Sequence, residues 1–194
     1  MSEIEVLDWK GLSTFYYKNL VKKKEPGDGN CFFHCIADSF YLPYQTGKVN
    51  RSEFTKKMRL QLSLLLESKN DRGVMWYKTL SRGKLEELSQ NLPELSLDNM
   101  KKHLGSNAFV DNRFNEFISN VFNKDIYILN QDTKDVYKAG VEGNLLYRNR
   151  ESIVIIWCNQ NHFDLVGIIE ENRIRTLFDP NHPLIQKIKE RLNN

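Results

Sequence analysis

The stretch that decides the fold is residues 25–40, EPGDGNCFFHCIADSF. Its front half is polar and glycine-rich, and its back half is apolar at helical spacing, through Phe32, Phe33, Ile36, Ala37 and Phe40. The pattern predicts a helix from Asn30 to Leu42, and Pro43 lies just beyond it, where a helix usually stops. Cys31 therefore lies at the N-terminus of the predicted helix, directly after a tight turn.

A cysteine at a helix N-terminus has a chemical advantage. The partial positive charge and free amides of that terminus make a thiol easier to ionise, and the same amides can hold an oxyanion. Gly27 and Gly29 let the backbone turn tightly, and Asp28 and Asn30 can brace the loop through side-chain to backbone hydrogen bonds. The alternative is that Cys31 is a small, buried and inert core residue behind an asparagine cap. This stretch alone leaves both interpretations open.

A nucleophilic thiolate needs a base, and the base needs an orienting partner. The chain has four histidines. His34, three residues after Cys31 on the same helix, is too constrained to serve easily as the base, so we expect it on the surface or at a rim facing the substrate. His103 and His182 lie at the end of a polar helical stretch and in a turn, and both are expected to be exposed. His162 is the remaining candidate.

His162 opens a predicted strand in NHFDLV, directly after a hairpin loop. Side chains two apart on a strand share a face, so Asp164 can accept the Nδ1 proton of His162 and leave Nε2 free to face a thiol. Phe163 and Leu165 then point into a core. A strand-end histidine with a chance acidic neighbour is the alternative, but chance rarely pairs it with the cysteine motif. Asp28 could also be the third residue of the site, the one that orients the base. An aspartate in a glycine-flanked turn, however, more often binds its own backbone.

Length and charge limit the class of protein. A chain of 194 residues, 40% hydrophobic and 27% charged, suits one soluble globular domain. The net charge of +3 is mild, and no basic stripe alternates with stacking aromatics, so no nucleic-acid partner is expected. We interpret the lysine run at 22–24 as a solvated segment. The longest apolar run, Ile153 to Cys158, has the length of a strand and is far short of the ~20 residues of a membrane span.

The cysteines favour a reducing compartment. There are three, an odd number that is low for a secreted scaffold, and the N-terminal MSEIEVLDWK lacks a signal-peptide core. We therefore expect a cytosolic protein with free thiols. A zinc site would need a second pair of ligands elsewhere in the chain to complete the set begun by Cys31, His34 and Cys35, and the sequence offers none. Neither a zinc site nor a cofactor is therefore expected.

The rest of the chain places helices first and strands later, which is typical of an α+β fold. Helices are predicted at 52–67, with Ser52 as the cap, at 74–104 in pieces broken at Gly83 and Pro93, at 111–122, and after Pro183. Strands are predicted at 125–130, 135–140, 152–159 and 162–169. We expect one domain over residues 1–194, with a core at about 20–170 and a C-terminal helix at about 183–193.

Two motifs together resemble a known family. GDGNCFFHCIAD resembles the nucleophile motif of the ovarian-tumour (OTU) family of cysteine proteases, Asp-Gly-Asn-Cys followed by a helix. NHFDL, about 130 residues later, resembles its second motif, a His, an aromatic residue and an Asp or Asn. RFNEFISNVFNKDIYIL is similar to the helix and strand between them, so the likeness covers roughly Leu20 to Glu170. The chain departs at His34, where the family often has an arginine or another long side chain, and around Ala108–Val110, where it often has Trp-Gly.

The resemblance implies a papain-like fold, a small twisted β-sheet between helical layers with the nucleophile helix docked against the sheet. It also implies a deubiquitinating cysteine protease that hydrolyses isopeptide bonds after the C-terminal glycine of ubiquitin or a ubiquitin-like modifier. Cys31 would attack the carbonyl, His162 would activate the thiol and protonate the leaving amine, and Asp164 would orient His162. Backbone amides of the oxyanion loop Asp28–Asn30, together with that of Cys31, would hold the oxyanion, without a metal or cofactor.

The expected partners are ubiquitin or polyubiquitin and ubiquitinated proteins, with no nucleic acid, no membrane and a monomeric chain. A compact catalytic domain is typical of stand-alone or virus-encoded members of the family. A viral enzyme would act in the host cytosol and evade immunity by removing ubiquitin, or a related modifier, from defence proteins. Two alternatives stay open: a ubiquitin-binding module that has lost catalysis, and a papain-like thiol amidase that acts on small molecules.

Overall fold

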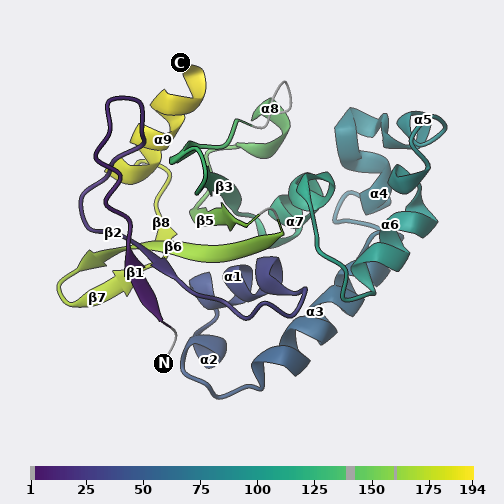
Figure 1. Cartoon of the computed structure of the whole chain (residues 1–194). Helices are drawn as coiled ribbons and strands as arrows, with labels where there is room; N and C mark the ends of the chain where they lie inside the picture. Colours follow the sequence, from purple (N-terminus) through teal and green to yellow (C-terminus); the bar gives the residue numbers. More distant parts are fainter. Residues whose placement is uncertain (1–2, 139–142, 160) are drawn as a thin grey trace.

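The computed structural model describes residues 3–138, 143–159 and 161–194. They form an α+β fold in which one sheet lies between helices, with a helical lobe to one side (Figure 1). The predicted fold class is confirmed. Within the described residues, no helix combines the length and the apolar character needed to cross a bilayer. The single-domain boundary at residues 1–194 stays a prediction.

The sheet is mixed and its strands come from both ends of the chain. Its main path has the order β1-β2-β6-β5-β3-β4, with β7 added to β6 and β8 added to β5. Among the strand pairs of the described residues, β3 and β5 alone pair in parallel. The strands are β1 (Ile4–Val6), β2 (Leu20–Lys23), β3 (Asp125–Asn130), β4 (Asp135–Val136), β5 (Ser152–Cys158), β6 (His162–Glu170), β7 (Arg173–Arg175) and β8 (Leu177–Phe178).

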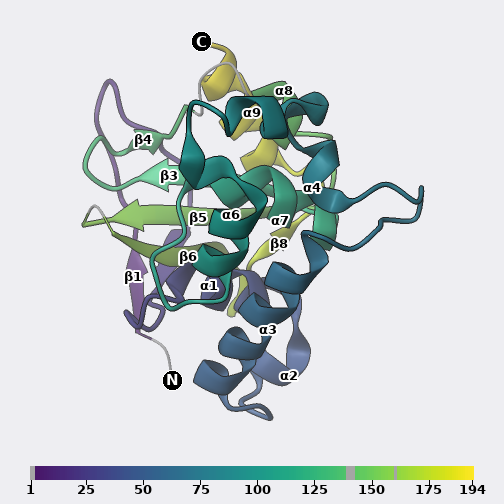
Figure 2. The ribbon, with the colours of Figure 1, turned by 90° about the vertical axis from the view of Figure 1, so that its right-hand side faces the viewer.

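The helices cover both faces of this sheet and build the lobe. They are α1 (Cys31–Phe40), α2 (Leu42–Gln45), α3 (Arg51–Leu65), α4 (Trp76–Thr79), α5 (Leu85–Leu88), α6 (Leu97–Leu104), α7 (Asn115–Phe122), α8 (Gly143–Leu146) and α9 (Pro183–Asn193), with 3-10 turns at Leu80–Gly83, Pro93–Leu95 and Asn112–Phe114. Figure 2, in which the lobe faces the viewer, shows α4 and α6 in front of the sheet and α3 running below them.

Alternation along the strands divides the core into two layers. One layer packs α1 and α7 against the first set of side chains, Ile126, Ile128, Ile153, Ile155, Phe163 and Leu165. The other packs α9 against the second set, Tyr127, Leu129, Val154, Ile156, Val166 and Ile168. Because β5 is covered on both faces, it consists of a nearly continuous apolar run and does not alternate with polar residues. Phe163 and Leu165 face the core beside α1, as predicted.

The helices end close to the predicted boundaries, but the predicted N-cap residue of α3 was wrong. The helix at Cys31 ends at Phe40, and Pro43 lies in the first turn of α2, where a missing amide hydrogen costs nothing. The 74–104 segment is helical in short pieces, as expected. The cap of α3 is Asn50 rather than Ser52, since the Asn50 side chain accepts from the Glu53 amide at 3.0 Å.

The N-terminal strands were not predicted, and the interpretation of the lysine run as solvated was wrong for Lys22. Lys22 lies in β2 with only 4% of its surface exposed, and its Nζ contacts Glu5 at 2.9 Å and Gln131 at 3.0 Å. It is therefore not part of a solvated segment. The strand predicted at 135–140 is confirmed only at β4; its residues 139 and 140, and residue 160 of the predicted hairpin loop, lie outside the described residues.

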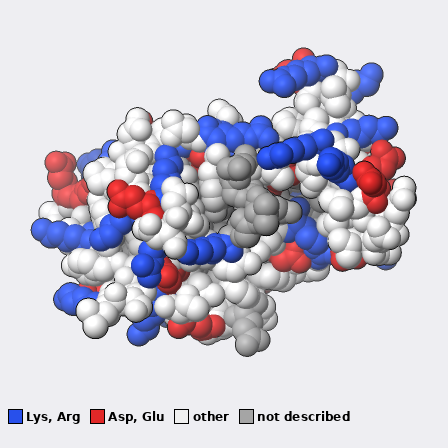
Figure 3. Space-filling model, turned by 90° about the horizontal axis from the view of Figure 1, so that it is seen from above, with Lys and Arg blue, Asp and Glu red and all other residues white. Residues whose placement is uncertain are grey.

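The surface carries no single dominant charge on the face seen from above. Figure 3 shows basic and acidic side chains interspersed with neutral ones over that face. This agrees with the small net charge of the chain.

Candidate active site

Cys31 is the first residue of α1 and is almost fully buried, with 1% of its surface exposed. Its backbone amide belongs to the first helical turn, whose amides have no partner within the helix. Its Sγ lies 3.4 Å from the backbone nitrogen of Phe163, which donates a weak hydrogen bond to it. The start of α1 and the start of β6, 132 residues apart, therefore meet at the sulfur.

His162 opens β6 and bonds to Asp164, which lies two residues further on the same strand. The atoms joined are Nε2 of His162 and Oδ1 of Asp164, at 2.8 Å. The expected assignment of the two ring nitrogens is therefore wrong. With Nε2 turned to the carboxylate, Nδ1 is the ring nitrogen that remains for Cys31, the second group that raises the pKa of His162. The pairing of His162 with Asp164 on one face of the strand was predicted.

Hydrogen bonds to Asp164 and to Cys31 raise the pKa of His162 to about 10. The imidazole is therefore protonated at neutral pH while these partners are in place. Burial alone would raise the pKa of Asp164, but the hydrogen bond from His162 and the one from the Glu25 amide outweigh it and lower that pKa. Asp164 is thus ionised when His162 is charged.

Groups from β2, from the segment that follows it and from β5 surround the Asp164 carboxylate. The Glu25 amide donates to Oδ1 at 2.8 Å, and Nζ of Lys22 lies 3.9 Å from Oδ2. The Cys158 thiol lies 3.8 Å from the same Oδ2. Burial first, and then the Asp164 charge, raise the pKa of Cys158 to about 12, so this thiol stays protonated near neutral pH.

The loop before Cys31 is tightly shaped. Asp28 Oδ1 accepts from the Asn30 amide at 3.0 Å, a turn that the sequence predicted. Gly29 has a φ of +81°, and a Cβ at this position would lie 2.1 Å from the backbone oxygen of Asn107. Only glycine fits there, because any side chain would collide with fixed backbone.

Arg59 of α3 supports this loop from below and was not predicted. It is 1% exposed and donates to the Gly29 oxygen and to Asn30 Oδ1, both at 3.0 Å. It also donates to three backbone oxygens at the end of the lobe, those of His103, Leu104 and Ala108, at 2.9 Å each. Burial lowers the pKa of Arg59 to about 10 against the opposing influence of Cys31 and Asp28, so the guanidinium stays charged at neutral pH.

The other histidines differ from expectation. His34 was expected at the surface or on a rim, but it is fully buried and bonds to Asp28 and Tyr44. His103 and His182 were expected to be exposed, but both are partly buried. His103 bonds to the Phe109 oxygen at 2.7 Å, and His182 caps α9. None of the three lies beside the sulfur as His162 does.

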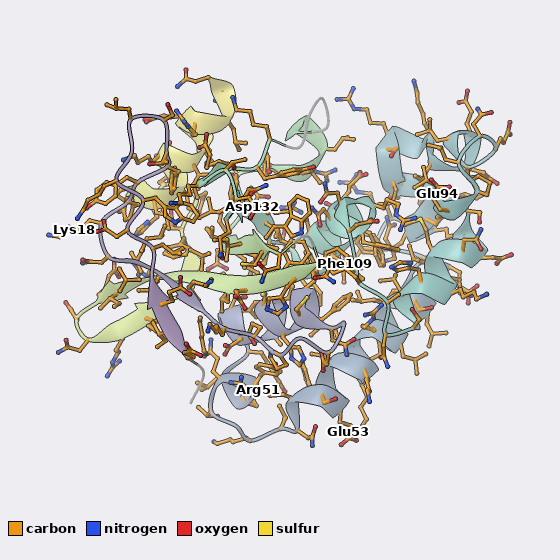
Figure 4. The ribbon with its side chains drawn as sticks, in the orientation of Figure 1. Lys18, Arg51, Glu53, Glu94, Phe109 and Asp132 are labelled. Atoms are coloured by element: carbon orange, nitrogen blue, oxygen red, sulfur yellow. The ribbon has the colours of Figure 1, made fainter. Side chains whose placement is uncertain are left out.

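An aromatic pocket of about 290 Å³ lies next to the cysteine. It is lined by Phe109, Asp111, Asn112, Arg113, Ile128, Tyr137, Trp157 and Phe163. Phe109 stacks on Phe163 with ring centroids 5.2 Å apart, and Figure 4 shows Phe109 between the sheet and the helical lobe. Since Phe163 also donates to the Cys31 sulfur, the pocket and the nucleophile share a wall.

No family model and no curated protein matches the chain. A solved OTU domain in complex with ubiquitin is 15% identical, covers 90% of this chain and 84% of its own, and superposes with a TM-score of 0.55. The chain has an OTU fold. Also similar is the OTU of Hazara virus bound to ubiquitin, with 13% identity, coverage of 87% of this chain and 88% of that chain, and a TM-score of 0.49. An OTU deubiquitinase from Wolbachia pipientis wMel has 16% identity, coverage of 90% of this chain and 98% of that chain, and a TM-score of 0.45.

Within this OTU fold, sequence reasoning missed the groups that support the candidate site from a distance. The Glu25 amide and Lys22 lie behind Asp164, and Arg59 lies under the loop. No periodic pattern could identify them, because they reach the site through pairing of β2 with β6 and packing of α3 on the lobe. The sequence did contain a local signal for the contact of His34 with the loop, because His34 lies one helical turn after Cys31, on the side of the helix from which the loop enters.

In the described part of the chain, no three His, Cys, Asp or Glu side chains cluster in a way that could hold a metal ion.

Proposed function

We propose that this chain is a thiol-dependent deubiquitinase that hydrolyses the isopeptide bond after the C-terminal glycine of ubiquitin or of a ubiquitin-like modifier. The observation that carries the proposal is the meeting of Cys31, His162 and Asp164 at the N-terminus of α1. A cysteine, a base beside it and a carboxylate bonded to the base form the arrangement that nucleophilic thiol catalysis needs.

In the first half of the reaction, the Cys31 sulfur attacks the glycine carbonyl as a thiolate. The carbonyl oxygen becomes an oxyanion, which the Cys31 amide and the amides of Asp28 and Gly29 in the oxyanion loop can approach, whereas the Asn30 amide is already bonded to Asp28 Oδ1. The C–N bond then breaks, and Nδ1 of the His162 imidazolium gives its proton to the leaving lysine amine. The product is a thioester between Cys31 and the glycine. Asp164 stabilises the imidazolium through Nε2 and fixes the ring.

In the second half, water attacks the thioester. His162, neutral after the first step, takes a proton from the water, and the resulting hydroxide adds to the carbonyl carbon. Collapse of the second oxyanion breaks the C–S bond and releases the glycine as its carboxylic acid, which loses its proton to solvent and becomes the carboxylate. The proton stays on His162, so the starting thiolate and imidazolium return. Every bond that forms or breaks is accounted for without a metal or cofactor.

Two observations support ubiquitin as the substrate class. The OTU domain with a TM-score of 0.55 was solved in complex with ubiquitin. The aromatic pocket beside Cys31, which includes Trp157 and Tyr137, offers an apolar wall for the segment that precedes the scissile glycine.

The test is hydrolysis of ubiquitin carrying a fluorogenic amide at its C-terminus. Wild-type protein should release the fluorophore, and Cys31→Ala should not, while Cys31→Ala still binds ubiquitin in a calorimetric titration. Binding without turnover by the wild type would favour the catalytically silent module instead. Turnover of small amides but not of the ubiquitin substrate would favour the papain-like thiol amidase.

We also propose that the enzyme acts in the cytosol, because its three cysteines are free and buried, and that it acts as a monomer. Light scattering during gel filtration and imaging of a tagged chain in cells test the two parts. A viral source, and host defence proteins as targets, stay predictions.

A further inference from the structure

The peptide unit between Gly29 and Asn30 is held at both edges. Its carbonyl oxygen, on Gly29, accepts from Nη1 of Arg59 at 3.0 Å, and its amide, on Asn30, donates to Oδ1 of Asp28 at 3.0 Å. A peptide unit is a rigid plane, so two bonds on opposite edges stop it from turning. The next peptide unit carries the Cys31 amide. The direction in which the loop presents its donors therefore depends on Arg59 and Asp28.

Asp28 needs support of its own, because 34% of its side chain is exposed and water can compete for its oxygens. His34 supplies that support from the protein interior. Its Nε2 lies 3.1 Å from Oδ1 and 3.2 Å from Oδ2 of Asp28, and the His34 side chain has no exposed surface. The carboxylate is thus anchored to α1 on one side while it accepts the Asn30 amide on the other.

Tyr44 of α2 decides which nitrogen of His34 carries the proton. Its hydroxyl contacts Nδ1 of His34, and burial raises the pKa of that hydroxyl, so it stays protonated and can donate. Burial lowers the pKa of His34 despite the nearby Asp28 charge, so the ring is neutral at neutral pH. A neutral imidazole that accepts at Nδ1 must carry its hydrogen on Nε2, the nitrogen that faces Asp28.

We propose that His34 and Tyr44 are positioning residues for the oxyanion loop. The chain of hydrogen bonds runs from the Tyr44 hydroxyl to His34, from His34 to Asp28, and from Asp28 back to the Asn30 amide. Neither His34 nor Tyr44 contacts the substrate. Their effect on rate rests on the proposed deubiquitinase function, but their effect on the loop does not. Because oxyanion donors act on the transition state and not on the bound ubiquitin, loss of the chain lowers kcat and leaves KM nearly unchanged.

The sharpest variant is Tyr44→Phe, which removes one oxygen and keeps the ring against Phe54. We expect kcat on the fluorogenic ubiquitin substrate to fall about tenfold and KM to stay within about twofold. Tyr77→Phe is the matched control. It removes the hydroxyl of another buried tyrosine, 4% exposed against 0% for Tyr44; that hydroxyl donates to the Leu95 oxygen at 2.9 Å in the lobe, and its loss should leave kcat unchanged. Equal kcat for Tyr44→Phe and Tyr77→Phe would overturn the proposal.

A second pair of variants separates positioning from folding. The amide of His34→Gln can still donate to Asp28, whereas His34→Leu cannot. We expect His34→Gln to keep several-fold more kcat than His34→Leu when both are assayed below their melting temperatures. If both are equally slow although both are folded by circular dichroism, His34 does not act through Asp28. If neither folds, the comparison of Tyr44→Phe with Tyr77→Phe carries the test alone.

Hydrogen exchange of the Asn30 amide gives a readout that needs no substrate. In the wild type this amide is bonded to Asp28 and should exchange slowly by NMR. It should exchange faster in Tyr44→Phe, and not in Tyr77→Phe. An inactive wild type with this exchange pattern would refute the proposed function and leave the positioning chain intact. Unchanged exchange in Tyr44→Phe would refute the chain, whatever the activity.

Discussion

At the residue scale, three cysteines of similar burial have different chemistry because of what lies beside them. Cys31 alone lies at a helix N-terminus and beside a charged imidazole. Burial, together with the nearby Glu25 charge, raises the pKa of Cys35, and burial with Asp164 raises that of Cys158 to about 12. These two thiols therefore stay protonated and unreactive.

This difference predicts selective labelling. A ubiquitin-derived electrophile should modify Cys31 and leave Cys35 and Cys158 untouched at neutral pH. Peptide mapping by mass spectrometry measures the three sites in one sample. Cys35→Ala and Cys158→Ala should label as the wild type does and lose no more than a few-fold in rate, whereas comparable labelling at all three thiols would contradict an activated site.

Asp164 and Asp28 make contrasting predictions for the pH profile. Asp164→Ala removes the first cause of the raised pKa of His162, so that pKa falls from about 10 and the alkaline limb of the rate profile moves to lower pH. The rate itself should fall by at least about tenfold. Asp28→Ala should also slow the reaction, through the loop, but should leave the alkaline limb in place. Rates measured from pH 5 to 10 for both variants decide which aspartate orients the base.

At the element scale, α3 has two inward faces. One is apolar; Met58, Leu62, Leu65 and the C-cap residue Leu66 belong to it. The other is a polar stripe at four-residue spacing, Thr55, Arg59 and Ser63. Ser63 bonds to the Lys101 oxygen at 2.8 Å, and Arg59 bonds to both the lobe and the oxyanion loop. The stripe therefore ties the lobe to the candidate site.

Replacement of Arg59 should be severe. Arg59→Met removes a donor from four carbonyl oxygens and from Asn30 Oδ1, and the bonds to the Leu104 oxygen and to Asn30 Oδ1 are buried. We expect the free energy of unfolding to fall by about 3 kcal/mol or more. Lys57→Met on the exposed side of the same helix, where Lys57 pairs only with Glu53, should change it by less than about 0.5 kcal/mol. Urea denaturation of both variants measures the difference, and equal losses would show that the Arg59 contacts do not stabilise the fold.

At the scale of the whole molecule, stability depends on pH through two groups, Glu25 and His162, that stay protonated in the native state to a higher pH than in the unfolded chain. Burial, with help from Asp38, raises the pKa of Glu25 to about 9, and that of His162 is about 10. Both pKa values lie above those of the same groups in the unfolded chain. At a pH between the unfolded and the folded pKa of a group, the native state therefore binds more protons than the unfolded state. The stability that these groups contribute is complete below their unfolded pKa values and is lost as the pH rises through the folded ones.

The melting temperature should therefore fall as the pH rises from about 7 to about 10. Glu25→Gln, whose neutral amide takes the place of the protonated carboxyl, should show a shallower fall. Glu86→Gln is the control, since Glu86 is exposed and should leave the wild-type dependence intact. Thermal melts at matched ionic strength give the three curves. A fall as steep in Glu25→Gln as in the wild type would mean that Glu25 is ionised in the native state.

The sequence by itself determined the parts that depend on local spacing. The helix at Cys31, the glycine turn before it, and the pairing of His162 with Asp164 each follow from residues within one turn of helix or two steps of strand. Hydrophobic period and turn chemistry act over that range, so they could be interpreted without a fold. The α+β class and the central strands β3, β5 and β6 followed in the same way.

Only the tertiary structure decided what lies behind those residues. Lys22 and Glu25 reach Asp164 because β2 pairs with β6, and Arg59 reaches the oxyanion loop because α3 packs under it. The choice of Nε2 over Nδ1 also depends on how the ring meets α1. Pairing and packing join residues far apart in the chain, and the energy of a buried polar group depends on partners that no local window contains. For this reason Lys22, from a run that looked solvated, lies in a buried strand, and a histidine expected at the surface lies in the interior.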